Sequence, residues 1–162
     1  MFEMLTEIDF KIERKELFEK LGGIPKPATE GSAGFDVFAC IEEELTIYPG
    51  ETIKVPTGFS MHIKNPNWSA IFIPRSGLGS KKGLVIGNLV GLIDSDYQGE
   101  CFIPVWNRNL NTETHKTGIK IQPGERIAQM VFLPVAKPFF NLVDGFSNQT
   151  ERGSGGFGST GI

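Results

Sequence analysis

From residue 33 onward the chain is a series of short apolar runs with β-strand character, each interrupted by glycine or proline. In "ELTIYPGETIKVPTGFSMHI" the apolar residues Phe59, Met61 and Ile63 alternate with polar ones, which is the two-residue period of a strand with one buried face. Turn signals recur about every 8–12 residues, a rhythm typical of an all-β sandwich or barrel. With 162 residues and no internal linker, the sequence predicts a single all-β domain with a sizeable core.

Two segments of this β-rich region echo each other. "LTIYPGETI" and "IKIQPGERI" both place Pro-Gly between two short strands, with Ile47 and Ile53 in one matched by Ile121 and Ile127 in the other. Proline presets φ at the first central position of a type II turn, and glycine accepts the positive φ of the second. The sequence therefore predicts two similar hairpins with Pro-Gly turns.

Residues 11–23, "KIERKELFEKLGG", carry the one convincing helix signal. Leu17, Phe18 and Leu21 share one face, charged residues fill the other, and Gly22-Gly23 supply a C-terminal stop. We expect a helix lying on the surface of the β domain.

Composition excludes several functional classes. The formal net charge of -3 provides no basic field for nucleic acid, and no apolar run approaches the roughly 18 residues of a membrane span. The N-terminus has no signal-peptide core, so we expect a cytoplasmic protein with no nucleic-acid or membrane partner. Cys40 and Cys101 are isolated, as expected of two buried, reduced thiols. His62 and His115 are the only histidines, too few for a histidine-based metal cluster.

Two segments in the first half of the β region carry residues suited to binding charge. In "SAGFDVFA", Asp36 stands between Phe35 and Val37, and a carboxylate in an apolar strand is costly unless it is paired or close to a cation. "PRSGLGSKKG" combines Arg75 and Ser76 with turn-forming glycines, whose exposed N–H groups suit phosphate oxygens. The spacing is not that of a Walker A loop, and a basic surface loop is the alternative interpretation.

Two further segments follow. "GNLVGLIDSDYQGE" brings Asp94, Asp96 and Tyr97 together beside glycines, as in a functional site, a polar turn or a weak cation site. "GERIAQMVF" places Gln129 among apolar neighbours with Arg126 near the turn, where pairing within the core is the default interpretation.

The chain ends in "RGSGGFGSTGI", whose five glycines cannot contribute to a core. Arg152 offers a bidentate fork to phosphate, and Phe157 offers a flat face on which a base can stack. Phosphate-binding backbone beside a stacking ring indicates a nucleotide, and a disordered terminus is the alternative. We therefore divide the chain into an N-terminal extension with the helix, a β core and a glycine-rich flexible arm, at residues 1–32, 33–150 and 151–162.

Taken together, "AGFDVFA", "PRSGLGSKKG", "GLIDSDYQGE", "GERIAQMVF" and "RGSGGFGSTG" resemble, in this order and at these separations, the five motifs of the trimeric dUTPase family. The resemblance covers residues 33–162. It implies a β-sandwich of jelly-roll type and a homotrimer with three active sites between subunits, in which the C-terminal arm crosses to close a neighbour's site. It also implies Mg2+-assisted hydrolysis of dUTP to dUMP and pyrophosphate, which keeps uracil out of DNA and supplies thymidylate synthesis.

The resemblance also implies roles for individual residues. Asp94 corresponds to the residue that activates the attacking water and touches the sugar 3′-hydroxyl, and Tyr97 to the ring that packs under the deoxyribose and excludes a ribose 2′-hydroxyl. Asn88 resembles the uracil-reading position, helped by the backbone of Gly91, Leu92 and Ile93. Phe157, followed by Gly158, resembles the ring that covers the uracil.

The phosphates and the metal are assigned in the same way. Arg75, Ser76 and Gly77 would hold phosphates, and Asp36 would reach the hydration shell of Mg2+. Gln129 matches a glutamine near the α-phosphate, and Arg152 resembles a clamp on the γ-phosphate. The implied catalytic set is thus Asp94, Gln129 and Arg152.

Two alternatives remain at this level. The related dCTP deaminases share the fold but carry a proton-shuttling glutamate where this chain has Pro104. A non-catalytic, nucleotide-sensing regulatory trimer could instead use the N-terminal helix or the polar insert at residues 107–118 to bind a protein partner.

Overall fold

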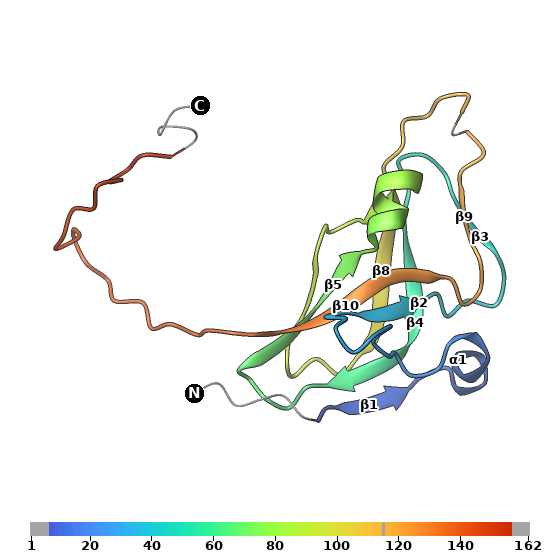
Figure 1. Ribbon diagram of the computed structural model, residues 1–162, viewed down its shortest axis with the longest axis horizontal. Helices are drawn as coiled ribbons and strands as arrows, with labels where there is room; N and C mark the ends of the chain where they lie inside the picture. Colours follow the sequence, from blue (N-terminus) through green and yellow to red (C-terminus); the bar gives the residue numbers. More distant parts are fainter. Residues whose placement is uncertain (1–6, 115, 157–162) are drawn as a thin grey trace.

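The computed structural model describes residues 7–114 and 116–156, and this part of the chain consists mostly of antiparallel strands (Figure 1). One four-stranded sheet has the order β1 (Asp9–Ile12), β4 (Thr52–His62), β8 (Glu100–Asn107) and β6 (Leu84–Ile86). The other has the order β2 (Phe35–Phe38), β10 (Arg126–Pro134), β5 (Trp68–Pro74) and β7 (Gly91–Ile93). A third, two-stranded sheet joins β3 (Leu45–Ile47) to β9 (Ile119–Ile121).

Both four-stranded sheets contribute to one hydrophobic core. Val55 and Ile103 from the first sheet and Val37 and Ala70 from the second are all fully buried. The alternation seen in the sequence places Phe59 in this core together with Met61 and Ile63. The expected all-β, jelly-roll-like sandwich is therefore confirmed, and its two sheets supply the walls of the site described below.

The two Pro-Gly turns form as expected, but they do not close hairpins. Gly50 and Gly124 have φ angles of 83° and 75°, and each turn is closed by a backbone bond of 3.0 Å, from Glu51 N–H to the Tyr48 carbonyl and from Glu125 N–H to the Gln122 carbonyl. The strands before the turns, β3 and β9, pair with each other, whereas the strands after them, β4 and β10, enter different large sheets. The prediction of two hairpins was therefore wrong, because each turn is a corner between sheets.

The predicted N-terminal helix is shorter than the sequence suggested. α1 spans Lys15–Leu21 and buries Phe18, and its chain reverses at Gly22 and Gly23 as expected. Ahead of it, β1 pairs along β4 with Phe10 opposite Met61. The expectation of helix from residue 11 was wrong there, because the edge of the sheet offers a full ladder of backbone bonds to the extended chain.

A five-residue π-helical turn, η1 (Leu78–Lys82), follows β5 and is the second helical element of the described residues. Cys40 and Cys101 are buried and unpaired, as expected. No helix in residues 7–114 and 116–156 is long and apolar enough to cross a bilayer.

After β10 the chain leaves the sandwich and runs away from it as an extended segment, drawn in orange and red in Figure 1. We call this whole segment, from residue 135 onward, the arm, and the glycine-rich stretch predicted at residues 151–162 is its end. The last backbone hydrogen bond between described arm residues and the sandwich runs from Val135 N–H to the Asn67 carbonyl, at 2.8 Å. The arm exposes large apolar side chains almost completely, with Phe139 at 96%, Leu142 at 97% and Phe146 at 91%.

Candidate active site

An open pocket of about 350 Å³ lies between β7 and β8, at the junction of the two large sheets. Its walls include five residues that the sequence singled out, and its remaining lining comes mostly from β8. The predicted members are Asn88, Leu92, Ile93, Asp94 and Tyr97. The other lining residues are Lys54, Glu100, Cys101, Phe102 and Pro104. Residues from three stretches of sequence thus meet in one cavity of the size that small ligands occupy.

The turn between β6 and β7 brings the chain from one sheet to the other and forms one end of this pocket. Leu89 adopts a φ of 64° there, and its N–H donates to the Ile86 carbonyl at 2.9 Å. Asn88 in this turn is exposed toward the pocket, while Gly91 at the start of β7 is buried against Phe72. Gly91 therefore sets the position of the strand, and Leu92 and Ile93 form the wall.

The pocket contains two carboxylates in different states. Glu100 accepts two hydrogen bonds from the Arg14 guanidinium, at 2.7 Å from Nε and 3.3 Å from Nη2. Asp94 follows β7 directly, is exposed, and its carboxylate bonds no side chain among residues 7–114 and 116–156. Asp94 is therefore the carboxylate of this pocket that is available to a ligand or a water molecule.

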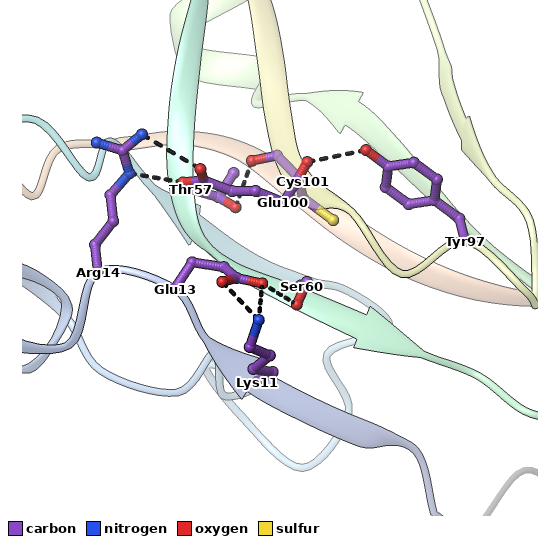
Figure 2. Close-up of polar contacts among 8 residues, drawn as sticks. All are labelled: Lys11, Glu13, Arg14, Thr57, Ser60, Tyr97, Glu100 and Cys101. Carbon is purple, nitrogen blue, oxygen red and sulfur yellow. Dashed lines mark hydrogen bonds and ion pairs between the residues drawn. The ribbon is translucent and has the colours of Figure 1, made fainter.

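Tyr97 lies in the connection between β7 and β8 and lines the pocket, where the first residue of β8 holds its hydroxyl. Its hydroxyl donates to the backbone carbonyl of Glu100 at 3.1 Å (Figure 2). The ring lies so close to Gly99 that a Cβ atom there would stand 2.5 Å from the phenolic oxygen. Glycine at position 99 is thus required for this position of the ring.

Asp36 does not line this pocket but forms the centre of a second polar cluster. Its carboxylate accepts hydrogen bonds from Arg75 Nε and Arg126 Nη1, each at 3.1 Å, and its side chain is only 12% exposed. The sequence required this carboxylate to be paired or close to a cation, and the two arginines meet that requirement by ion pairing. We name Asp36, Arg75 and Arg126 the arginine cluster.

The loop after Arg75 begins with exposed residues, and hydrogen bonds from Arg108 and Asn109 hold its backbone. Ser76 and Gly77 stand at its start, and the Ser76 carbonyl accepts a hydrogen bond from the Ser80 hydroxyl at 2.6 Å. Arg108 Nη2 donates to the Gly79 carbonyl at 3.0 Å, and Asn109 Nδ2 donates to the Lys82 carbonyl at 2.8 Å. The start of the polar insert therefore fixes the glycine-rich loop, so that its outer face is free to meet anions.

The remaining predicted residues lie apart from the pocket. Gln129 is half-buried in β10, where its register partners are Asp36 and Ile73, so it adjoins the arginine cluster. Arg152 lies exposed on the arm. Phe157 and Gly158 lie outside the described residues.

Several residues of the site were not identified from the sequence. Arg126 was noted only for its place beside a turn, and its bond to Asp36 depends on the pairing of β10 with β2. Glu100 and Lys54 line the pocket from adjacent strands; Glu100 closes the motif "GNLVGLIDSDYQGE" but was given no role there, and no local pattern marks Lys54. Arg14 was assigned to a surface helix, although it precedes α1 and reaches the wall of the pocket.

An apolar pocket of the same volume, about 350 Å³, lies elsewhere and has a different chemistry. It is lined by Glu7, Ile8, Phe10, Ile24, Pro25, Phe35, Met130 and Phe132. Since its only charged side chain is a carboxylate, it does not suit a phosphorylated ligand. The pocket between β7 and β8 is therefore the candidate active site.

Comparison with known proteins agrees with the geometry. The chain is 53% identical over 154 residues to the deoxyuridine 5′-triphosphate nucleotidohydrolase of Tolumonas auensis, covering 93% of this chain and 97% of that protein. It is 51% identical over 158 residues to the Escherichia coli (strain ATCC 8739) protein of the same name, covering 98% and 99%.

A solved structure, the Staphylococcus bacteriophage 80alpha dUTPase with dUpNHpp, superposes with a TM-score of 0.82 at 28% identity, covering 96% of this chain and 99% of that one. The sequence model of the dUTPase family matches residues 21–161. This chain therefore belongs to the dUTPase family.

Proposed function

We propose that this protein is a dUTP diphosphatase, which hydrolyses dUTP to dUMP and pyrophosphate and so keeps uracil out of DNA. One observation carries the proposal: a single pocket gathers Asn88, Asp94 and Tyr97, and Asp94 is its one carboxylate without a side-chain partner among the described residues. Family membership and relatives named for this activity support it.

The pocket suits a deoxynucleoside. The Asn88 amide both donates and accepts hydrogen bonds, as reading the pairing edge of uracil requires, and the backbone of β7 lies beside it. The aromatic face of Tyr97 offers a flat support for the deoxyribose. A pocket that fits the smaller base and sugar rejects a 5-methyl or a 2′-hydroxyl by steric clash. The free-energy cost of such a clash can exceed the contribution of one methylene to binding, which is about 1–3 kcal/mol.

Asp94 acts as the general base in this proposal. An exposed carboxylate at the pocket wall can accept a proton from the water that attacks the α-phosphorus, an effect typically worth about 10²–10⁴-fold in rate. Negative charge then builds on the phosphate oxygens and the leaving pyrophosphate. Arginine side chains and N–H groups directed at those oxygens stabilise it.

Arg75 of the arginine cluster and the exposed loop at Ser76 and Gly77 are the proposed phosphate ligands. Asp36 holds the Arg75 guanidinium in place, and Gln129 on the neighbouring strand lies close to the same position. Each oxygen of Asp36 accepts one arginine bond, which leaves lone pairs to accept a hydrogen bond from a metal-bound water. The residues thus fit an Mg2+ ion bound through its hydration shell, which would neutralise triphosphate charge.

We propose that complete sites form between subunits of a homotrimer. Two observations support sites built from more than one subunit. The pocket and the arginine cluster share no residue, and the arm runs away from its own sandwich. Burying one large apolar side chain such as Phe139 or Leu142 contributes about 1.5–3 kcal/mol, so the arm's apolar residues favour docking on another copy. In this arrangement Arg152 and Phe157 close a neighbour's site.

Within the family fold the deaminase alternative is not favoured. Pro104 lines the pocket where a deaminase would require a proton-shuttling carboxylate, and Glu100, the other acid of the wall, is bound to Arg14. The two buried thiols, Cys40 and Cys101, are in keeping with work in a reducing cytoplasm.

Pyrophosphate release from dUTP, dTTP, dCTP and UTP tests the proposed activity. We expect dUTP to be strongly preferred, without ammonia release from dCTP. Equal turnover of dTTP or UTP would contradict the proposed pocket. Deleting residues 152–162 should leave the assembly intact and nearly abolish turnover, and a truncated protein with the full-length rate would contradict the role of the glycine-rich end of the arm.

A further inference from the structure

We propose that Arg14 is a positioning residue for the nucleotide pocket, and that Glu13 and Arg14 together form an N-terminal clamp that holds Tyr97 in place and neutralises Glu100. The inference deepens the proposed function and rests on it. It assigns to the N-terminal extension a part in substrate selection, although the extension contributes no side chain to the pocket wall among Asn88, Asp94 and the other lining residues.

The clamp begins with a bidentate ion pair across a long sequence separation. Arg14 Nε and Nη2 donate to the two carboxylate oxygens of Glu100, at 2.7 and 3.3 Å (Figure 2). The Glu100 side chain is only 18% exposed, and its hydrogen bonds raise the pKa of Arg14 above the ordinary value. Bidentate arginine–carboxylate pairs fix direction as well as distance. Arg14 therefore fixes the orientation of the first residue of β8.

Glu13 binds the β4 residue that pairs with Glu100 across the sheet. Its carboxylate accepts a hydrogen bond of 2.6 Å from the hydroxyl of Ser60, and this bond lowers the pKa of Glu13. Ser60 in β4 is the register partner of Glu100 in β8. Two consecutive residues of the N-terminal segment thus hold the two members of one strand pair, as Figure 2 shows.

The sheet needs support at this point because its ladder is interrupted. The register between β4 and β8 shifts between Pro56 and Ser60, where Gly58 bulges with a φ of 78°. The Gly58 carbonyl accepts hydrogen bonds from the N–H groups of Glu13 at 2.8 Å and Arg14 at 3.4 Å. A bulge leaves groups unpaired and bends its strand. These two bonds tie the clamp to the backbone of β4 at the bulge.

The clamp reaches the pocket through the backbone of Glu100. The carbonyl of this residue accepts the Tyr97 hydroxyl bond, and both residues line the pocket. The neighbouring Cys101 carbonyl is held in turn by the buried hydroxyl of Thr57, at 2.8 Å. A shift of Glu100 would move the acceptor on which the position of the tyrosine ring depends.

The clamp has a second, electrostatic consequence. Without Arg14, the Glu100 carboxylate would be an unpaired negative charge on the wall of a pocket proposed to receive a polyanion. Pairing removes that repulsion and keeps Glu100 from competing with Asp94 for the proton of a bound water. Loss of Arg14 should therefore weaken binding and relax selection against ribose.

Arg14→Gln is the test variant, and Lys15→Gln is the matched control, because it removes an exposed charge one residue away outside the clamp. For Arg14→Gln we expect the KM for dUTP to rise about tenfold and the preference for dUTP over UTP to fall about tenfold, since charge-assisted bonds are lost. The kcat for dUTP should change less than about threefold. Arg14→Lys should recover part of both effects.

Amide hydrogen exchange at residues 97–101 measures the clamp without any substrate. We expect exchange there to be about tenfold faster in Arg14→Gln and unchanged in Lys15→Gln. Equal exchange and equal dUTP preference in the two variants would overturn the inference, as would a loss of kcat and thermal stability with dUTP preference intact. If the wild-type protein failed to hydrolyse dUTP, the proposed function would fall, and the exchange result alone would decide whether the clamp exists.

Discussion

The arginine cluster can be tested by replacing Asp36 with asparagine, which keeps the shape of the side chain and removes its charge. In the structure each carboxylate oxygen accepts one arginine bond at 3.1 Å, from Arg75 and from Arg126. Asparagine can preserve one of these bonds through its carbonyl oxygen. Its amide nitrogen would face the other guanidinium, donor against donor.

The size of the effect follows from the exposure of the partners. A hydrogen bond to a charged group contributes about 1.5–3 kcal/mol. Because the Arg126 side chain is 51% exposed and Arg75 29%, solvent screening reduces this range. We expect Asp36→Asn to lower the free energy of unfolding by about 2 kcal/mol, which for a chain of this size lowers Tm by about 4–8 °C.

Thermal unfolding at one fixed protein concentration is the appropriate assay, since assembly makes Tm depend on concentration. The KM for dUTP should rise in the same variant, because Arg75 loses the group that holds it. Arg126→Gln is the internal comparison and should cost less, given the greater exposure of that side chain. A Tm within 1 °C of the wild-type value together with an unchanged KM would contradict the role of Asp36 in holding the two arginines.

Three further predictions follow from close contacts and burial. Gly58→Ala forces a residue into a φ of 78° and sets its Cβ 2.5 Å from the Cys40 sulfur, so we expect a loss of about 2–4 kcal/mol in urea unfolding. Gly99→Ala displaces the Tyr97 ring, and we expect a lower preference for dUTP over UTP in competition assays, whereas unaltered preference would show that the ring is not needed there. Burial, with a smaller contribution from the nearby Glu100 carboxylate, raises the pKa of the Cys101 thiol from 9.0 to about 12, so the unfolded chain loses this proton at lower pH than the folded chain. The free energy of unfolding should therefore fall by up to about 1.4 kcal/mol per pH unit from about pH 9 toward pH 12. Cys101→Ala should remove this part of the pH dependence when the urea midpoints of the two proteins are compared across the same pH range.

Local patterns in the sequence were sufficient to predict the turn conformations and the buried face of a strand. The positive φ of Gly50 and Gly124 and the burial of Phe59 follow from residue type and period. The pairing of β3 with β9 does not, because the partner of a strand is decided by contacts distant in sequence. For the same reason residues 9–12 joined the edge of a sheet rather than extending the helix.

Part of the pocket lining was predictable from the sequence, but the arrangement of the candidate site was not. Asn88, Asp94 and Tyr97 lie within ten residues of one another, in the two connections that flank the short strand β7, so their closeness in sequence brings them to the same pocket. Glu100 looks like an ordinary charged residue in the sequence, and its importance appears only when Arg14, 86 positions earlier, is placed beside it. No local sequence pattern predicts an ion pair between residues so far apart in the chain.

In the proposed reaction the Asp94 carboxylate activates the attacking water in the pocket between β7 and β8. The most direct measurement is pyrophosphate release at saturating dUTP by Asp94→Asn, compared with wild type and with nucleotide binding measured in parallel. Turnover should fall by about 10²–10⁴-fold in the variant, with nucleotide binding retained. Turnover at the wild-type rate in the variant would contradict this role of Asp94.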